Sequence, residues 1–304
     1  PQTGAHEWVM SFDLNSLYPH IIMQYNMSPE TVVNDMQYEA NVEDLLKRTE
    51  YKIPEKYCMT GTGQYFDKSR KGIVPEIIQK LYDERSVVKR KMLTAQQRGQ
   101  DEGSSYEIEK EITTLDNQQM AVKILMNSLY GALSNEHFRY YDMRVAESIT
   151  VSGQLTIRWA EDTINRYMNK VLKTDNEDYI IAIDTDSLYV RMSKLVEQVN
   201  PKDPIKFLDK VGQEKLEPLM IEAYDELYNY MNAYEQKMVM AREVIADKGI
   251  WTGKKHYALN VYNNEGVQYK EPKLKIMGIE VVRSSTPQPC RDFLRDTIKV
   301  IMNK

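Results

Sequence analysis

The pattern of apolar and polar positions between residues 75 and 133 predicts two long helices joined by a short link. Pro75 has the place that proline takes at the first position of a helix, and Glu76 follows it in the first turn. The polar stretch 99–105 is expected to end this helix near residue 98. A second helix is expected over residues 106–133. The short link makes the two an antiparallel pair.

The remaining segments alternate between helical and strand patterns. Further helices are expected at residues 17–25, 144–173, 205–234 and from 289 to a truncated end at 304. Strands are expected at residues 7–13, 237–245, 257–262 and 267–276, with a turn at 263–266. Hairpins are expected at residues 59–67 and 179–191, the second with Asp184, Thr185 and Asp186 at its tip. The chain is therefore predicted to combine helices with antiparallel hairpins.

Composition excludes several classes of protein. The 304 residues are 42% hydrophobic and 28% charged, as in globular proteins with a sizeable core. There is no run of 18 apolar residues and no signal-peptide pattern, so no transmembrane helix is expected. Cys58 and Cys290 are too few for a disulfide scaffold or a thiolate metal site. The first residue is Pro1 rather than Met, which suggests a piece of a longer protein.

Charge is distributed unevenly along the chain. The net charge is −5, yet residues 244–304 hold 11 Lys and Arg against 6 Asp and Glu. A basic C-terminal quarter could follow a phosphate backbone. An ordinary uneven surface explains the same numbers, and charge alone favours that simpler interpretation.

Acidic residues stand at the ends of two predicted strand segments. Asp13 ends a strand before a tight turn into a helix, and Asp184 and Asp186 lie on a hairpin tip. Each segment alone is more typical of a helix cap or a solvated turn. Taken together, ionised carboxylates about 4 Å apart would repel by roughly 4 kcal/mol at an effective dielectric near 20. Divalent cations would turn that repulsion into a site, and oxygen ligands indicate Mg²⁺.

Basic and polar side chains share faces on the two long helices. Arg85 and Lys89 are four residues apart, and Lys123 begins a second set spaced for one helix face. That second set continues with Asn127, Tyr130 and Gly131. Antiparallel packing could bring both faces to one triphosphate, whose charge three cations would offset. A solvated charged stripe is the alternative, although Lys123 lies in an apolar stretch and fits it less well. Lysines interleaved with aromatic residues at 251–257 and 273–278 are a further, weaker indication of contact with a nucleic-acid backbone.

Four of these segments resemble the motifs of family B DNA polymerases, in the order of that family. They are DLNSLYP at 13–19 (motif A), KILMNSLYG at 123–131 (motif B), DTDS at 184–187 (motif C) and KKHY at 254–257 (the Lys-x-Tyr element). FRYYD at 138–142, WTGKK at 251–255 and KLKIMG at 273–278 resemble the T-even bacteriophage replicative branch. Single motifs carry a risk of false positives, but four in order over most of the chain do not arise by coincidence.

The resemblance implies an α+β fold. The polymerase palm would be an antiparallel sheet with packed helices, and an α-helical hairpin would form the fingers. The implied map is palm at 1–74, fingers at 75–135, palm again at 136–284 and the start of a truncated thumb at 285–304. The N-terminal and 3′–5′ exonuclease domains of the family are not expected in this chain.

The implied activity is template-directed DNA synthesis from dNTPs onto a primer 3′-OH during phage replication. The resemblance implies two Mg²⁺ ions, with Mn²⁺ as a substitute, and primer–template DNA and dNTPs as partners. Separate exonuclease or thumb chains and a sliding clamp are further expected partners, in the cytoplasm of an infected bacterial host and without a membrane. A non-catalytic or conditionally active polymerase fragment is the alternative. A generic two-metal phosphotransferase is a remoter one, which motif B disfavours.

The resemblance also implies a role for each matching residue. Asp13, Asp184 and Asp186 would be the catalytic acids; Asp13 and Asp186, with the carbonyl of Leu14, would hold the metals. Ser16, Leu17, Tyr18, Arg85, Lys89, Lys123, Asn127, Tyr130 and Gly131 would bind the dNTP, with Tyr18 excluding a 2′-OH. Lys254, Lys255, Tyr257, Lys273 and Lys275 would contact DNA, and Glu243 would be an accessory carboxylate.

Three positions depart from the family pattern. Ile183 stands where glycine usually precedes the first acid of motif C, and a β-branched residue does not readily take a positive φ. His20 replaces a usual serine, and Ala241 stands where phage relatives often have aspartate. Ile183 is expected to lower the efficiency of the chemistry, and Ala241, next to Glu243, is expected to remove an accessory metal position.

Overall fold

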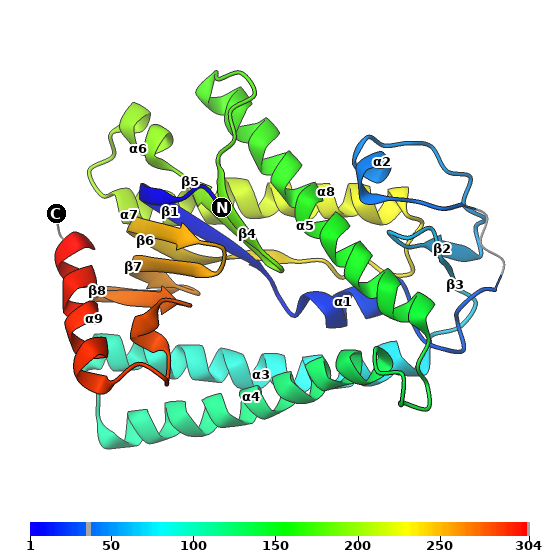
Figure 1. The fold of residues 1–304 in the computed structure, drawn as a ribbon, viewed down its shortest axis with the longest axis horizontal. Coiled ribbons are helices and arrows are strands. Elements are labelled where there is room, and N and C mark those ends of the chain that lie inside the picture. The colour runs from blue at the N-terminus through cyan, green and yellow to red at the C-terminus, as the bar shows by residue number, and fades with distance from the viewer. Residues whose placement is uncertain (35–37, 303–304) are drawn as a thin grey trace. The chain divides into compact units, whose positions relative to one another are not determined.

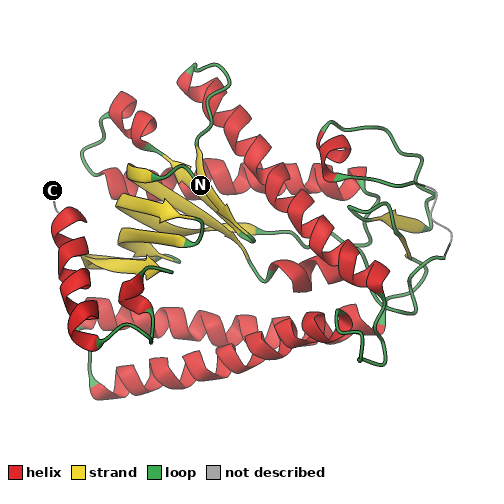
Figure 2. Ribbon diagram, in the orientation of Figure 1, coloured by secondary structure: helices red, strands yellow, loops and turns green. Residues whose placement is uncertain are grey.

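The computed structural model describes residues 1–34 and 38–302, which divide into two compact units. The first, here called the sheet unit, consists of residues 1–13, 163–218 and 241–304. The second, here called the helix-pair unit, consists of residues 14–162 and 219–240. Figures 1 and 2 show the chain as a mixture of long helices and one large sheet, which confirms the predicted α+β class.

Six strands form the sheet of the first unit, in the order β4-β5-β1-β6-β7-β8. Their bounds are β1 Gly4–Leu14, β4 Ile180–Asp184, β5 Ser187–Arg191, β6 Met240–Gly253, β7 His256–Asn264 and β8 Val267–Met277. β5 pairs antiparallel with both β1 and β4, and β7 pairs antiparallel with both β6 and β8. Two of the tight turns between strands are those expected from the sequence: Thr185 at the β4–β5 turn has φ 57°, and Gly266 at the β7–β8 turn has φ 87°.

One face of the sheet carries an apolar cluster that spans strands far apart in the sequence. Val9, Tyr189, Val244, Trp251 and Tyr257 are all buried in it. The sheet unit also contains the C-terminal part of α5 (Met143–Leu172), α6 (Ser193–Val199), α7 (Pro204–Val211), a π-helical turn (Gly212–Leu216), a 3₁₀ turn (Glu280–Val282) and α9 (Gln288–Met302). Burial of this cluster fixes the strand order and so fixes which strand ends lie side by side.

Two long helices, α3 (Ile73–Glu102) and α4 (Tyr106–Leu133), pack along each other in the helix-pair unit (Figure 1). Met92, Ala95, Ile108 and Met126 are buried on their apolar stripes. The link is short because Ser105 caps α4 at once, with its hydroxyl accepting from the Ile108 N–H at 3.3 Å. The unit also holds α1 (Leu17–Gln24), α2 (Val42–Leu46), β2 (Tyr57–Met59), β3 (Tyr65–Asp67), most of α5 and most of α8 (Glu217–Tyr230). α1 contacts both long helices.

The predicted elements are confirmed, with boundary corrections. The helix expected at 106–133 has those bounds, and both predicted hairpins are present. The first long helix begins two residues before Pro75 and continues through Gly99, which was expected to break it. A Cβ at Gly99 would lie 3.4 Å from Ile108 Cγ2, so glycine permits close packing of α4 and the packing offsets its poor helix propensity.

Other corrections concern segments near the unit boundaries. The helical segment expected at 205–234 ends at Tyr230, and the strand expected at 237–245 is the longer β6. The short helices α2 and α6 were not predicted, since each is too brief to show a period. Of the final helix, residues 303 and 304 lie outside the described part of the chain. Among the described residues, no helix is long and apolar enough to span a membrane.

Candidate active site

The acids expected at strand ends gather at one edge of the sheet unit. In the ladder, Ser187 at the start of β5 lies opposite Asp13 on β1 and opposite Asp184 on β4. Neighbouring strands are about 4.8 Å apart, so this register places Asp13 and Asp184 on either side of Ser187. Asp186 lies in the tight β4–β5 turn, where its N–H donates to the Asp184 carbonyl at 2.6 Å. The hydroxyl of Ser187 donates to Asp13 Oδ1 at 2.8 Å.

The electrostatics of Asp13 reflect both its burial and the acids around it. Burial and the neighbouring Asp186 carboxylate raise the pKa of Asp13 to about 7, with smaller contributions from Glu243 and Glu265. The hydrogen bond from Ser187 acts in the opposite direction. Because burial and neighbouring negative charge both raise the pKa of Asp13, a bound cation would stabilise its charged form. In the described part of the chain, however, no three acidic, histidine or cysteine side chains form a ready-made metal cluster.

Lysines pair with two other acids of this edge. Lys255 Nζ lies 3.2 Å from Asp184 Oδ1, and Lys275 Nζ lies 2.7 Å from Glu243 Oε1. Ser11 also donates to Glu243, at 3.2 Å. Asp184 and Glu243 are therefore charge-compensated by these two lysines.

The residues expected to contact DNA differ in exposure. Lys254, Lys255 and Lys273 are exposed, on the β6–β7 turn and on β8. Tyr257 is buried, and its hydroxyl hydrogen-bonds to that of Tyr189 at 2.7 Å. Tyr257 therefore supports the sheet under these lysines rather than presenting its ring to solvent.

In the helix-pair unit, the turn that follows β1 meets α3. Ser16 has left-handed backbone geometry (φ 51°) and precedes α1. Arg85 Nη1 donates to Ser16 Oγ at 3.0 Å, and Arg85 Nε donates to Gln119 Oε1 on α4 at 3.2 Å. Arg85 is 5% exposed. The turn before α1 and helix α4 thus both bond to the guanidinium group that α3 carries. Leu17, the first residue of α1, is buried.

Two aromatic rings lie together near the same turn. The rings of Tyr18 on α1 and Tyr130 on α4 have centroids 4.6 Å apart. Gly153 on α5 leaves room for Tyr18, since a Cβ there would lie 3.2 Å from Tyr18 Cε1. The close approach explains why a residue without a side chain is placed in the middle of this helix.

Lys123, Asn127 and Gly131 are exposed on α4, and Lys89 is half-buried on α3. Among the apolar neighbours of Lys123, Met120, Ile124 and Leu125 are exposed as well. The apolar stretch around Lys123 is therefore partly exposed, although Met126 within it is buried, and its composition alone does not exclude a solvated face.

Several residues that support these arrangements were not singled out from the sequence. Ser11 lies two residues before Asp13, on the same strand face, and Ser187 directly follows Asp186. Gln119 lies one helical turn before Lys123, and Tyr82 lies one turn before Arg85. These spacings are the only signals by which the sequence could have indicated them.

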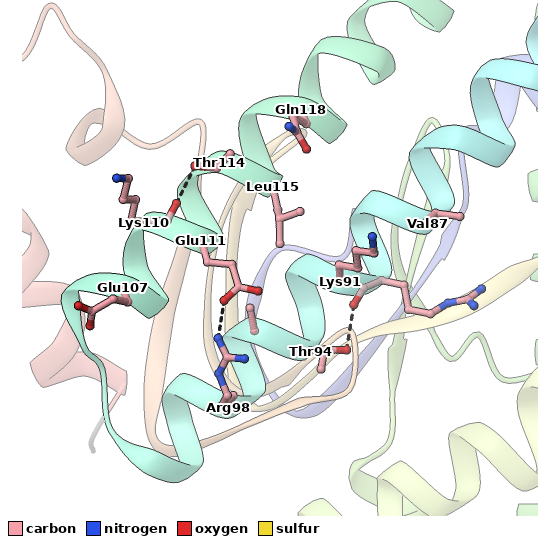
Figure 3. A pocket seen from close by; sticks show the side chains of 12 residues that line it. Val87, Lys91, Thr94, Arg98, Glu107, Lys110, Glu111, Thr114, Leu115 and Gln118 are labelled. Atoms are coloured by element: carbon pink, nitrogen blue, oxygen red, sulfur yellow. Dashed lines mark hydrogen bonds and ion pairs between the residues drawn. The ribbon is translucent and has the colours of Figure 1, made fainter.

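A cavity of about 800 Å³ lies elsewhere on the α3–α4 pair. Figure 3 shows the side chains that line it. It is lined by stripes from both helices, among them Lys91 and Arg98 of α3 and Lys110 and Glu111 of α4. The Arg98–Glu111 ion pair bridges the helices there. None of the predicted dNTP-binding residues lines this cavity. A lysine of its lining, Lys110, can therefore serve as a control for Lys123, the predicted dNTP-binding lysine on the same helix.

The model of DNA polymerase family B matches residues 1–304. The chain belongs to DNA polymerase family B. It is 37% identical to the DNA-directed DNA polymerases of Enterobacteria phage T4 and Escherichia phage RB69, over 100% of this chain and 40% of each relative. It is 27% identical to a DNA polymerase of Pyrococcus glycovorans, over 99% of this chain and 31% of that protein. The chain thus spans about two fifths of the length of the phage relatives that it matches.

Membership of the polymerase family makes the departures at Ile183 and Ala241 informative. Ile183 does not adopt a positive φ: it lies in β4 opposite Leu188, and Thr185 takes the left-handed conformation of the turn. The expected backbone strain at Ile183 is therefore absent. Ala241 is exposed at the start of β6, two residues before Glu243.

His20 makes stability depend on pH. Burial lowers its pKa to about 4, and the charges of Lys237 and Arg85 act in the same direction, against the hydrogen bond to the Ser16 carbonyl. As the pH falls, His20 therefore binds a proton at a higher pH in the unfolded chain than in the folded protein. The free energy of unfolding consequently decreases between about pH 6.5 and pH 4. We expect the parent to lose about 2 kcal/mol of unfolding free energy from pH 7.5 to pH 4.5, relative to His20→Asn. Denaturant titrations at both pH values measure this. An equal change in the parent and in His20→Asn would contradict this expectation. Both proteins contain Asp13, so the comparison also cancels the opposite pH dependence that its raised pKa causes.

Proposed function

We propose that this chain catalyses template-directed DNA synthesis, in which a primer 3′-OH attacks the α-phosphate of a dNTP and pyrophosphate leaves. The observation that carries the proposal is the Asp13–Asp186 pair at one sheet edge, where burial and the Asp186 carboxylate raise the pKa of Asp13 to about 7. Membership of the polymerase family supports the assignment of this pair to nucleotidyl transfer. The phage relatives favour a role in phage DNA replication, inside an infected bacterial cell.

Asp13 and Asp186, with the Leu14 carbonyl, are the groups that would hold two Mg²⁺ ions, for which Mn²⁺ could substitute. Their hard oxygen donors and mutual repulsion suit this cation. Bound there, the metal would supply a lowered pKa for the primer hydroxyl and neutralisation of the charge on the leaving pyrophosphate. We assign Asp184 to the catalytic acids as well and Glu243 to the accessory carboxylate. Asp184 pairs with Lys255 and Glu243 pairs with Lys275, two lysines that we assign to the primer–template.

The helix-pair unit supplies the groups that we assign to the incoming nucleotide. Arg85, Lys89 and Lys123 would bind the triphosphate, with Asn127 and the backbone amides at Ser16–Tyr18. The planar guanidinium of Arg85 can exchange its neutral partners Ser16 and Gln119 for charged phosphate oxygens, which are stronger acceptors. Tyr130 and Gly131 would border the nascent base pair.

The family map gives these elements their roles. We assign residues 1–74 and 136–284 to the palm, residues 75–135 to the fingers and residues 285–304 to the start of the thumb. The α3–α4 pair accounts for nearly the whole fingers range, and α9 for most of the thumb range. Separate exonuclease or thumb chains and a sliding clamp are the further partners that we propose.

Primer extension by the purified chain, with Mg²⁺ and four dNTPs, tests the proposal. Template-dependent products that require all four dNTPs would support it. The second candidate is a conditionally active fragment, which is favoured by the two-fifths coverage of the phage relatives. It predicts extension only when the remaining parts of a relative are added as separate chains. No extension under either condition would refute both candidates.

Tyr18→Ala should relax discrimination between sugars. The Tyr18 ring packs against Tyr130 and occupies the space left by the absent side chain of Gly153. We therefore assign it to the position beneath the deoxyribose. Removing it opens room for a 2′-OH, and steric discrimination of this kind contributes roughly tenfold or more. The measurement is kcat/KM for each dNTP divided by that for the matching NTP. Tyr106→Ala, an exposed position on α4, is the control. An unchanged ratio would show that Tyr18 only packs.

A further inference from the structure

Tyr82 on α3 is held from two sides by the segment that follows β1. The amide of Asn15 donates from Nδ2 to the Tyr82 hydroxyl at 2.9 Å. The ring of His20 meets the Tyr82 ring edge-on, with centroids 4.4 Å apart. Asn15 and His20 flank the turn and first helical turn of α1, so one tyrosine bridges both ends of this short segment.

The contact surface continues one helical turn further along α3. Arg85 follows Tyr82 by three residues, which places both side chains on one helix face. Tyr82 reaches Asn15 and His20, while Arg85 reaches Ser16 between them. The helical turn of α3 from Tyr82 to Arg85 is therefore fixed by two hydrogen bonds against the turn at Asn15 and Ser16.

Further contacts restrict the movement of the residues around Tyr82. His20 and Arg85 are each 5% exposed. His20 Nδ1 bonds to the Ser16 carbonyl at 3.0 Å, which fixes the imidazole plane that Tyr82 packs against. The backbone N–H of Asn15 bonds to the Val239 carbonyl at 3.4 Å, which anchors the turn itself. Movement of Tyr82 would leave the Asn15 amide and the buried edge of His20 without this partner.

We propose that Tyr82 is a positioning residue for nucleotide binding: anchored by Asn15 and His20, it sets where Arg85 presents its guanidinium to the triphosphate. The inference rests on the proposed function, in which Arg85 is a phosphate ligand. Bidentate binding of phosphate by arginine requires a defined approach of both N–H groups, so a small displacement of α3 weakens it. Ser16 holds Arg85 near its working position until phosphate oxygens replace the serine hydroxyl.

Tyr82→Phe tests this, because it removes the hydroxyl and keeps the ring against His20. The dNTP dissociation constant is measured by calorimetry with Mg²⁺ and a primer–template whose primer ends in a dideoxynucleotide, so that no turnover is needed. Loss of one such hydrogen bond corresponds to roughly a fivefold change in an equilibrium constant. We expect dNTP binding to weaken about fivefold and primer–template binding to stay unchanged. Tyr106→Phe, on the exposed start of α4, is the matched control.

Asn15→Ala provides the second arm. If Asn15 acts through Tyr82, this variant weakens dNTP binding to a similar extent, and combining it with Tyr82→Phe adds little further loss. Unchanged dNTP affinity in Tyr82→Phe, with or without a lower unfolding temperature, would overturn the proposal and leave Tyr82 a packing residue. A parent protein that binds primer–template but no dNTP would overturn this inference and the proposed function together. A parent that binds dNTP normally beside an unaffected variant would overturn only the inference.

Discussion

Replacement of Asp186 by Asn is expected to lower the rate of primer extension at least a thousandfold while leaving the fold intact. Asp186 is the largest charged contributor to the raised pKa of Asp13, so the two carboxylates share one small region of space. The amide of asparagine keeps the size of the side chain and removes its negative charge, and with it an anionic oxygen ligand. A thousandfold loss corresponds to about 4 kcal/mol of transition-state stabilisation, within the range supplied by metal-assisted catalysis.

The measurement is single-nucleotide incorporation under saturating primer–template, with circular dichroism to verify the fold. Asp175→Asn is the matched control, because Asp175 is exposed on a loop of the same sheet unit. Extension by Asp186→Asn within tenfold of the parent would contradict the assignment of this residue to the metals.

Much of the fold follows from local patterns, because the hairpins and the helix pair are built from neighbours in sequence. The turn at Asn263–Gly266 and the cap at Ser105 each encode their own geometry. Gly99 shows the limit of this reasoning. Local propensity predicts a break, but packing against Ile108 across the helix pair keeps the helix continuous. Tertiary contact outweighs a local cost of about 1 kcal/mol at such a position.

The candidate site divides in the same way. Acids at strand ends and basic residues at helical spacing can be recognised from the sequence, since their chemistry and their periods are local. Ser187 beside Asp13, and Tyr82 between Asn15 and His20, depend on strand register and helix docking across long sequence separations. A single sequence carries no signal for such pairs beyond the spacing of each partner from a residue already recognised. Ile183 is the opposite case, in which a sequence feature that suggested backbone strain has no such effect in the structure. The unusual residue causes no strain because the turn places its left-handed residue two positions later, at Thr185.

Lys123→Ala is expected to lower kcat/KM for dNTP incorporation about a hundredfold. Lys123 is exposed on α4, one helical turn after Gln119, the residue that holds Arg85 Nε. A triphosphate that binds Arg85 would therefore lie within reach of a cation on this face. Removing one preorganised charge from a phosphoryl-transfer site typically costs a hundredfold to a thousandfold, and the exposure of Lys123 favours the lower figure.

The α3–α4 pair itself supplies the control for Lys123. Lys110 lies on the same helix but lines the cavity of Figure 3, on a face that carries none of the predicted dNTP-binding residues. Lys110→Ala removes the same charge from the same helix, so a purely long-range effect of net charge would appear equally in both variants. We expect Lys110→Ala to match the parent within twofold, and Lys123→Arg to recover part of the loss because the charge is retained with altered geometry. Equal losses in Lys123→Ala and Lys110→Ala would mean that the basic residues of α4 act only through the overall field, and that Lys123 is not a ligand of the triphosphate.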